Sequence, residues 1–297
     1  MRALGLVLAA GSIGIAAPAL ADDKNTLVVL EPSSAWSVDF GEQKCRLARA
    51  FTNGENTHLL FLEQGGPDSS FGFVVMGSSF DRFKRPSRVS TQFGELEPID
   101  DREPFLGTTE GAGASLIYSS MTFSEPPEAD SGQAAATPRV GLPRIDETEA
   151  AKINSITIRQ GNRAVRFATG NLGDPIKVMN ECALNFVESW GLDRADHETM
   201  SRRPNWTNVQ ALARKLQQSY PSAALRKGES GIFRLRVIVE ADGSISDCVV
   251  NSATITESLE TPACKEMKRA EFEPALDKDG EPMRSFYTTR IIYRVSS

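Results

Sequence analysis

The chain has 297 residues, 40% of them hydrophobic and 24% charged, and its formal net charge is −6. This composition is typical of a folded globular protein and excludes a disordered or collagen-like chain. Residues 22–200 contain 17 basic and 27 acidic residues, whereas residues 201–297 contain 15 basic and 12 acidic residues. The change of sign predicts two domains. The basic surplus of the second part is small and unclustered, so nucleic acid is not expected as a partner.

Residues 1–21 have the pattern of a cleaved secretory signal peptide. Arg2 precedes an uncharged run, Ala3 to Ala21, which ends in Ala19-Leu20-Ala21 before two aspartates. Small residues at these positions suit cleavage by a signal peptidase. An uncleaved membrane anchor is the alternative, because a run of this length nearly spans a bilayer. The glycines and the proline within the run favour cleavage, which predicts an exported protein without stable membrane insertion.

Residues 22–196 are predicted to form a β-rich domain with one helix at its C-terminal end. Short aliphatic and aromatic runs, separated by Gly, Asn, Pro and Asp, are typical of antiparallel strands. These runs are residues 34–40, 44–51, 57–64, 71–77 and 88–96. Residues 96–113 and 124–150 are expected to be loops. Residues 153–170 have the pattern of a hairpin that turns at Gln160-Gly161-Asn162.

The helix of this domain is predicted between Asp174, a candidate cap, and Gly191. Its apolar stripe consists of Ile176, Met179, Ala183, Phe186, Val187 and Trp190. Cys182 lies beside this stripe, and Cys45 is the other cysteine of the domain. Because export favours disulfides, a Cys45–Cys182 bridge is predicted, with two separate buried thiols as the alternative.

Residues 197–206 are polar and irregular and are predicted to be a linker, with His197 at the surface. Residues 207–297 then have the pattern of a small α+β domain with the order strand, strand, helix, strand. The strand at 231–240 alternates apolar and charged residues, which predicts one buried and one solvent-exposed face. A turn at Asp242-Gly243 leads to a second strand at 244–252, and a helix is expected at 257–269.

A second disulfide, Cys248–Cys264, is predicted between that second strand and the helix, because both cysteines are expected on facing sides. The final strand, at about 284–295, also alternates. Tyr287, Ile291, Tyr293 and Val295 share one face, and the other face carries Phe286, Thr288, Arg290, Ile292 and Arg294.

Several short motifs in this region resemble those of a known family. They are Tyr220-Pro221, Gly231, Asp242-Gly243, Phe272-x-Pro274-Ala275 and Gly280-x-Pro282. In this order and at these spacings, about residues 207–297 resemble the TonB C-terminal domain family. The resemblance implies a periplasmic domain that binds a segment of an outer-membrane transporter, or of another envelope protein, as an added β-strand. The long Pro/Lys/Glu spacer of the family's archetype is absent, and residues 22–200 resemble no family that we recognise.

The resemblance places the final strand at the border of the sheet, where an added strand would bind. Phe286, Thr288, Arg290, Ile292 and Arg294 are therefore predicted to contact the partner, and Arg290 and Arg294 to select acidic side chains. The alternative is that these arginines guard an outer strand against aggregation. A proline at Thr289 or Ile291, whichever amide points outward, is expected to block binding.

No constellation of catalytic residues is evident, so an enzyme is not expected, and neither a cofactor nor a metal site is predicted. The glycines at 107–115 lack the Lys and Ser/Thr of a phosphate loop. His58 lies in a strand pattern, away from His197. The leading hypothesis is a periplasmic TonB-family protein that binds envelope peptides, with a role in TonB-dependent transport. The alternatives are a soluble interaction protein whose first domain binds its own ligand, and a hydrolase within residues 22–200.

Overall fold

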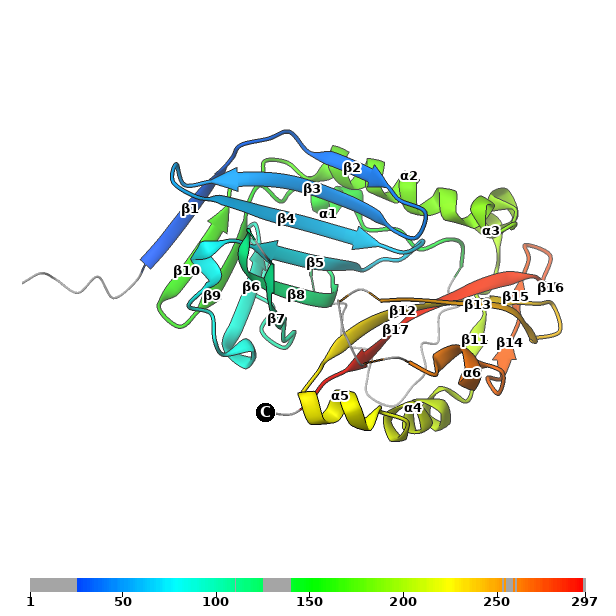
Figure 1. The fold of residues 1–297 in the computed structure, drawn as a ribbon. Coiled ribbons are helices and arrows are strands. Elements are labelled where there is room, and N and C mark those ends of the chain that lie inside the picture. The colour runs from blue at the N-terminus through cyan, green and yellow to red at the C-terminus, as the bar shows by residue number, and fades with distance from the viewer. Residues whose placement is uncertain are drawn as a thin grey trace, which may run out of the picture.

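The computed structural model describes residues 26–109, 111–124, 140–252, 254, 259 and 261–295. The predicted signal peptide lies outside these residues. The fold is mixed α+β, rich in strands and with few helices (Figure 1). Within the described ranges, no helix combines the length and the apolar character that a membrane-spanning segment requires.

The N-terminal region contains a ten-stranded sheet with the order β6-β9-β10-β1-β3-β4-β5-β8-β7, and β2 pairs with β3. The strands are β1 (Thr26–Pro32), β2 (Ser37–Phe40), β3 (Cys45–Thr52), β4 (Thr57–Gln64), β5 (Phe71–Met76), β6 (Val89–Phe93), β7 (Phe105–Thr109), β8 (Gly113–Met121), β9 (Ile156–Gln160) and β10 (Arg163–Phe167). β1 runs parallel to β10 and pairs antiparallel with β3 at its end. It therefore joins one half of the sheet, formed by β6, β9 and β10, to the other half, formed by β2, β3, β4, β5, β7 and β8 (Figure 1).

Side chains from both halves of the sheet form one apolar core. Its largest fully buried members include Phe51, Phe71, Phe73, Phe80, Phe93 and Phe167. Phe51 of β3 and Phe167 of β10 meet edge to face, with their ring centroids 5.1 Å apart. The burial of this aromatic surface stabilises the packing of the two halves against each other.

The strand predictions for this region are largely confirmed, including the hairpin of β9 and β10, whose turn has Gly161 at a φ of 60°. The loop predicted at residues 96–113 is wrong in part, because it contains β7. This strand is an edge, and its exposed Leu106 and Thr108 alternate with half-buried Phe105 and Gly107. An edge strand needs no fully apolar face, so its sequence lacks the usual signal.

The prediction of a single helix in this region is wrong, because its described residues form three: α1 (Glu147–Ala150), within the loop predicted at 124–150, α2 (Gly173–Ser189) and α3 (Arg194–Thr199). Two 3₁₀ turns, η1 (Ser78–Phe80) and η2 (Pro86–Arg88), follow β5. The Cys45–Cys182 disulfide forms as predicted and ties α2 to β3. Asp174 is not the cap of α2, because it lies within the first turn and Leu172 occupies the N-cap. The amide of Gly173 instead donates to Oδ1 of Asn171, at 2.8 Å.

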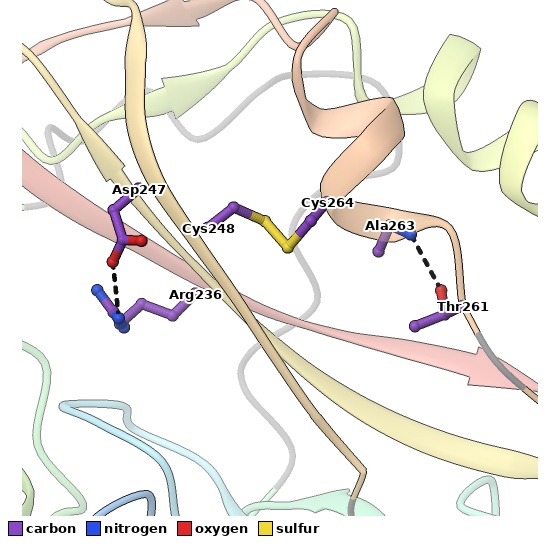
Figure 2. Close-up of a disulfide and its surroundings, with 6 residues drawn as sticks. All are labelled: Arg236, Asp247, Cys248, Thr261, Ala263 and Cys264. Atoms are coloured by element: carbon purple, nitrogen blue, oxygen red, sulfur yellow. Dashed lines mark hydrogen bonds and ion pairs between the residues drawn. A yellow bond between two sulfur atoms is a disulfide. The ribbon is translucent and has the colours of Figure 1, made fainter.

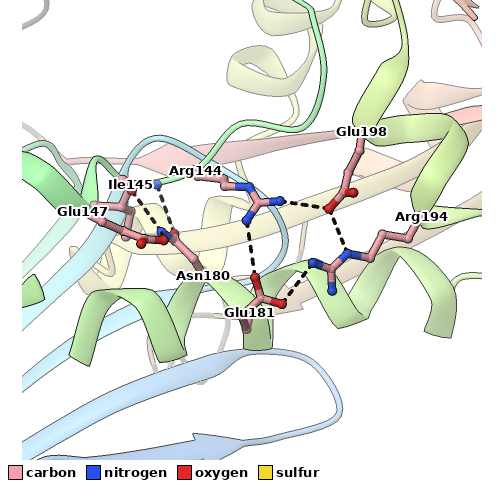
Figure 3. A network of polar contacts seen from close by, with 7 residues as sticks. All are labelled: Arg144, Ile145, Glu147, Asn180, Glu181, Arg194 and Glu198. Carbon is pink, nitrogen blue, oxygen red and sulfur yellow. Dashed lines mark hydrogen bonds and ion pairs between the residues drawn. The ribbon is translucent and has the colours of Figure 1, made fainter. Parts of the chain in front are cut away.

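The outer side of α2 is joined to the segment before α1 and to α3 by polar contacts (Figure 3). Arg144 and Arg194 each bind both Glu181 and Glu198, at distances between 2.8 and 3.3 Å. The buried amide of Asn180 donates to the carbonyl oxygen of Ile145 and accepts from its amide. Because the carboxylates and guanidinium groups alternate, the network holds three separate segments in register.

The C-terminal region contains a three-stranded antiparallel sheet with the order β13-β12-β17. Its elements are β11 (Asn205–Trp206), α4 (Val209–Gln218), α5 (Ser222–Lys227), β12 (Gly231–Val239), β13 (Ile245–Ser252), α6 (Ala263–Met267), β14 (Phe272–Glu273), β15 (Ala275–Leu276), β16 (Pro282–Met283) and β17 (Ser285–Tyr293). The longer elements β12, β13, α6 and β17 follow the predicted order, but the short strands β14, β15 and β16, which were not predicted, lie between α6 and β17. The helix α6 contains Ala263–Met267, and Leu259, Thr261 and Pro262 before it are not helical. Glu257, where the predicted helix begins, lies outside the described residues.

One face of this sheet packs against the helices of its own region. Leu235, Val237 and Val239 share a core with Leu212, Leu216, Ala263 and Met267. The predicted Cys248–Cys264 disulfide joins β13 to α6 on this side. Figure 2 shows this bridge, with Arg236 and Asp247 on the other side of the strands. The first face is thus closed by residues that are near in sequence.

The segment at 197–206 is folded and packed, contrary to the prediction of an exposed linker. His197 belongs to α3 and is only 1% exposed, and its Nδ1 lies 2.6 Å from the carbonyl oxygen of Asp193. β11 pairs with β14, and Arg202 forms a bridge with Leu276. Polar composition misled the prediction because several polar side chains here donate to backbone carbonyls, as Ser201 does to Asp277 and Arg202 to Pro274.

Candidate functional site

The second face of the C-terminal sheet carries most of the residues singled out from the sequence. We call it the arginine face, and it consists of Arg234, Arg236 and Ile238 of β12, Phe286, Thr288, Arg290 and Ile292 of β17, and Arg294. The sequence predicts that solvent covers it. In the structure the N-terminal region packs against it, and its arginines meet carboxylates of that region.

The most buried of these contacts centres on Glu63 of β4, whose side chain is 5% exposed. Its carboxylate accepts from Nη2 of Arg234 at 2.8 Å, from Nε of Arg46 at 2.7 Å and from Nζ of Lys44 at 2.9 Å. Burial by itself would raise the pKa of Glu63, but Arg234 and Lys44 outweigh burial and lower the pKa to about 2. Glu63 is therefore ionised at neutral pH and serves as a counter-ion between the two regions.

Arg290 of β17 forms a second polar contact with the N-terminal region. Its Nη2 lies 3.2 Å from Oδ2 of Asp68, and its Nη1 donates to the hydroxyls of Ser70 and Ser120. Burial lowers the pKa of Arg290, Asp68 opposes that shift, and repulsion from Arg234 adds to it. The two guanidinium groups are thus held close enough to repel one another.

Arg294 closes the interface at its outer end. Its Nη1 lies 2.7 Å from Oε2 of Glu103, and its guanidinium carbon lies 4.2 Å from the ring centroid of Phe105. Both partners of the ion pair are more than one-third exposed. Solvent screening therefore makes this contact weaker than the one at Glu63.

An apolar contact accompanies the ion pairs. Ile238 and Phe286 form a cluster with Val187 and Leu192, and the rings of Phe286 and Trp190 meet with centroids 4.9 Å apart. Gly66 makes this arrangement possible, because a Cβ at that position would lie 2.5 Å from the Trp190 ring. Its φ of 156° is also one that residues with side chains rarely adopt.

The outer edge of β17 is unpaired, since β12 is the one strand among the described residues with which it pairs. The amide of Ile232, in β12, and the amide of Glu240, directly after β12, both point to the β13 side. They donate to Thr254 and Ser244. Amide direction alternates along a strand, so the odd-numbered residues of β12 pair with β17. The register joins odd-numbered residues to odd-numbered residues, as in Leu235 with Thr289.

It follows that the backbone groups on the free edge belong to the even-numbered residues Phe286, Thr288, Arg290 and Ile292. The amides of Thr289 and Ile291 point to β12, so neither of the two proline positions considered from the sequence tests the edge. The side chains of the edge residues differ in their contacts. Phe286 and Arg290 are held by the N-terminal region, whereas Ile292 is 47% exposed.

The structure brings together residues that sequence reasoning missed. Glu63, Asp68, Glu103 and Trp190 all contact the arginine face, although they lie far from it in the chain. One signal was present in the sequence, because Glu63 follows an apolar strand pattern at a position where a charge would be buried. Its counter-ion could not be identified, because Arg234 is 171 residues away.

Residues 217–295 match the family model described as Gram-negative bacterial TonB protein C-terminal. The matched residues include β12, β13, α6 and β17, so the sheet with the arginine face and the free edge belongs to this domain. The match confirms the resemblance predicted for about residues 207–297, within narrower bounds. No curated protein matches the chain.

Proposed function

We propose that this protein is a periplasmic TonB-family protein that binds an extended segment of an outer-membrane transporter, or of another envelope protein, along the free edge of β17. The proposal includes a role in TonB-dependent transport across the envelope. The observation that carries it is the unpaired edge of β17 within a TonB C-terminal domain. An unpaired edge presents amides and carbonyls that an extended peptide satisfies by strand addition.

The contacts of the arginine face determine how such a peptide would be recognised. Arg290 and Arg294 already bind Asp68 and Glu103, so they are not free to select acidic side chains while the two regions are packed together. Recognition in this state would rest on backbone pairing and on exposed Ile292. Affinity would then depend little on the charge of the peptide.

We further propose that the protein acts by binding and not by catalysis. Both histidines are buried in structural contacts, which supports this view. The amide of Ser79 donates to Nε2 of His58, whose ring packs against Gly77, and His197 stacks on Phe286.

The direction of the amides provides a direct test of strand addition. Thr288→Pro removes an outward amide and should leave the sheet intact, because edge strands tolerate proline. Thr288→Ala is the matched control, since it keeps the amide. Titration of the isotope-labelled full chain with synthetic peptides from outer-membrane transporters should shift the amides of Thr288, Arg290 and Ile292.

The expected result is affinity about tenfold weaker for Thr288→Pro than for Thr288→Ala, from the loss of a hydrogen bond and the bulk of the ring. Thr289→Pro should unfold the domain, because that amide pairs with β12. Amide shifts confined to β13, or the absence of shifts with every peptide, would refute the proposed edge.

A further inference from the structure

A cavity of about 340 Å³ lies between the arginine face and the N-terminal region. Its C-terminal wall is formed by Arg234 and Arg236 of β12, Val249 and Asn251 of β13, and Thr288 and Arg290 of β17. The N-terminal wall includes Gly65, Gly66, Phe186 and Trp190. The volume lies within the range of pockets that hold small molecules.

The polar wall of the cavity carries an excess of positive charge. Lys44, Arg46 and Arg234 all bind Glu63, whose single negative charge neutralises only one of them. Of the three, Arg234 lines the cavity. Arg236 is paired with Asp247 and Arg290 with Asp68, and Glu42 also lines the space. Among the lining residues, Arg234, Arg236 and Arg290 face two carboxylates, Glu42 and Asp68, and this excess of one positive charge favours an anion in the cavity.

One nitrogen of the Arg236 guanidinium can still donate a hydrogen bond. Its Nη2 binds Oδ2 of Asp247 at 2.9 Å, but its buried Nη1 has no hydrogen-bond partner among the described residues. An unsatisfied buried donor is costly, and a carboxylate oxygen would satisfy it once a small movement of the guanidinium uncovers Nη1, which the protein covers in this structure. Arg234 and Arg290 line the same cavity and repel one another, so an anion beside them would also relieve that repulsion.

The opposite wall includes the aromatic residues Phe186 and Trp190. The rings of Phe186 and Trp190 stack at 5.8 Å with an interplanar angle of 9°, and Trp190 also lies 5.1 Å from the guanidinium of Arg236. Gly66 allows the loop after β4 to lie directly against the Trp190 ring. An apolar body would therefore find the aromatic surface beside the donors that bind its acid group.

We propose that this cavity binds a small carboxylate with a flat apolar body, whose acid group is held by Arg236 together with Arg234 and whose body packs on Trp190. The site shares the residues Thr288 and Arg290 with the free edge of β17, but it requires no bound peptide. Because both regions of the chain form it, occupancy would strengthen their association.

Phenylacetate is a suitable probe, and phenylacetamide is its uncharged counterpart of the same shape. Calorimetric titration of the full chain is expected to show saturable binding of phenylacetate at least tenfold tighter than that of phenylacetamide. Arg236→Gln should weaken phenylacetate binding by at least tenfold. Arg226→Gln, at an exposed position on α5, is the matched control and should leave binding unchanged.

A second measurement locates the probe. In the labelled full chain, phenylacetate should shift the indole N–H resonance of Trp190, which is identified by its loss in Trp190→Phe. Three results would each overturn the proposal: equal affinity for the acid and the amide, unchanged binding in a folded Arg236→Gln variant, and no saturable binding up to the solubility of phenylacetate. None of these bears on strand addition at β17.

Discussion

The two faces of the C-terminal sheet are closed in different ways. One face buries Leu235, Val237 and Val239 under helices of the same region, and a disulfide joins the layers. The other face is closed by the N-terminal region, through ion pairs around a small apolar cluster. Apolar burial depends little on pH or salt, whereas ion pairs depend on both. The two faces should therefore respond differently to the same changes of solvent.

The largest effect is expected on the apolar face. Leu235→Ala should lower the free energy of unfolding by about 3 kcal/mol, because Leu235 is 1% exposed and its removal leaves a cavity. Denaturant unfolding measures this change. Leu225→Ala, at an exposed position, is the control and should cost less than about 0.5 kcal/mol. Similar losses in the two variants would mean that this face is not the core.

The disulfide on the same face should contribute nearly as much. The sequence separation of 16 between Cys248 and Cys264 predicts a loss of about 3 kcal/mol in the double variant Cys248→Ser and Cys264→Ser. Thermal unfolding of the oxidised wild type and the double variant compares them directly. A reductant should destabilise the wild type by breaking both disulfides. It should destabilise the double variant less, because that protein has only the Cys45–Cys182 bridge to lose.

On the arginine face, the largest effect is expected at Glu63. Glu63→Gln removes the charge that Lys44, Arg46 and Arg234 share but keeps an acceptor oxygen, so the loss of charge-assisted hydrogen bonds should cost about 2 kcal/mol. Glu55→Gln, at an exposed turn, is the matched control. Hydrogen exchange should increase in β12 and β17 of the Glu63 variant and not in β13. Unchanged exchange on these strands would contradict the role assigned to this carboxylate.

The same carboxylate predicts a pH dependence. The folded state lowers the pKa of Glu63 from 4.5 to about 2, so its stabilising contribution is complete above pH 4.5 and is lost as pH falls toward 2. Wild-type stability should decrease through this window more steeply than that of Glu63→Gln. Parallel decreases in the two proteins, measured by denaturant unfolding at each pH, would assign the acid sensitivity to other groups.

The smallest effect is expected at Arg294. Its ion pair with Glu103 is partly exposed, so Arg294→Gln should cost less than about 1 kcal/mol, and less still at high salt. Thermal unfolding at low and high ionic strength would show this. A loss as large as that of Glu63→Gln would mean that the outer end of the interface matters as much as its buried centre.

The sequence by itself determined the features that depend on neighbouring residues. Alternation within β12 and β17 assigned each side chain to a face, and the turns at Gly161 and Gly243 set the hairpins. Both disulfides were predictable: Cys45–Cys182 because the domain boundary left Cys182 one partner, and Cys248–Cys264 because a strand pattern and a helix pattern placed the two cysteines on facing elements. The ordered motifs of residues 217–295 were sufficient to recognise the TonB C-terminal domain. These signals lie within short windows, where backbone geometry controls the periodicity.

Only the tertiary structure decided what covers the arginine face. Alternating arginines have the same pattern whether water or another region faces them, and their carboxylate partners are 171, 222 and 191 residues away. The burial of His197 and the choice of outward amides on β17 follow from the same packing and from the strand register. Ion pairs over such separations form only when complete surfaces dock, so no local pattern encodes them.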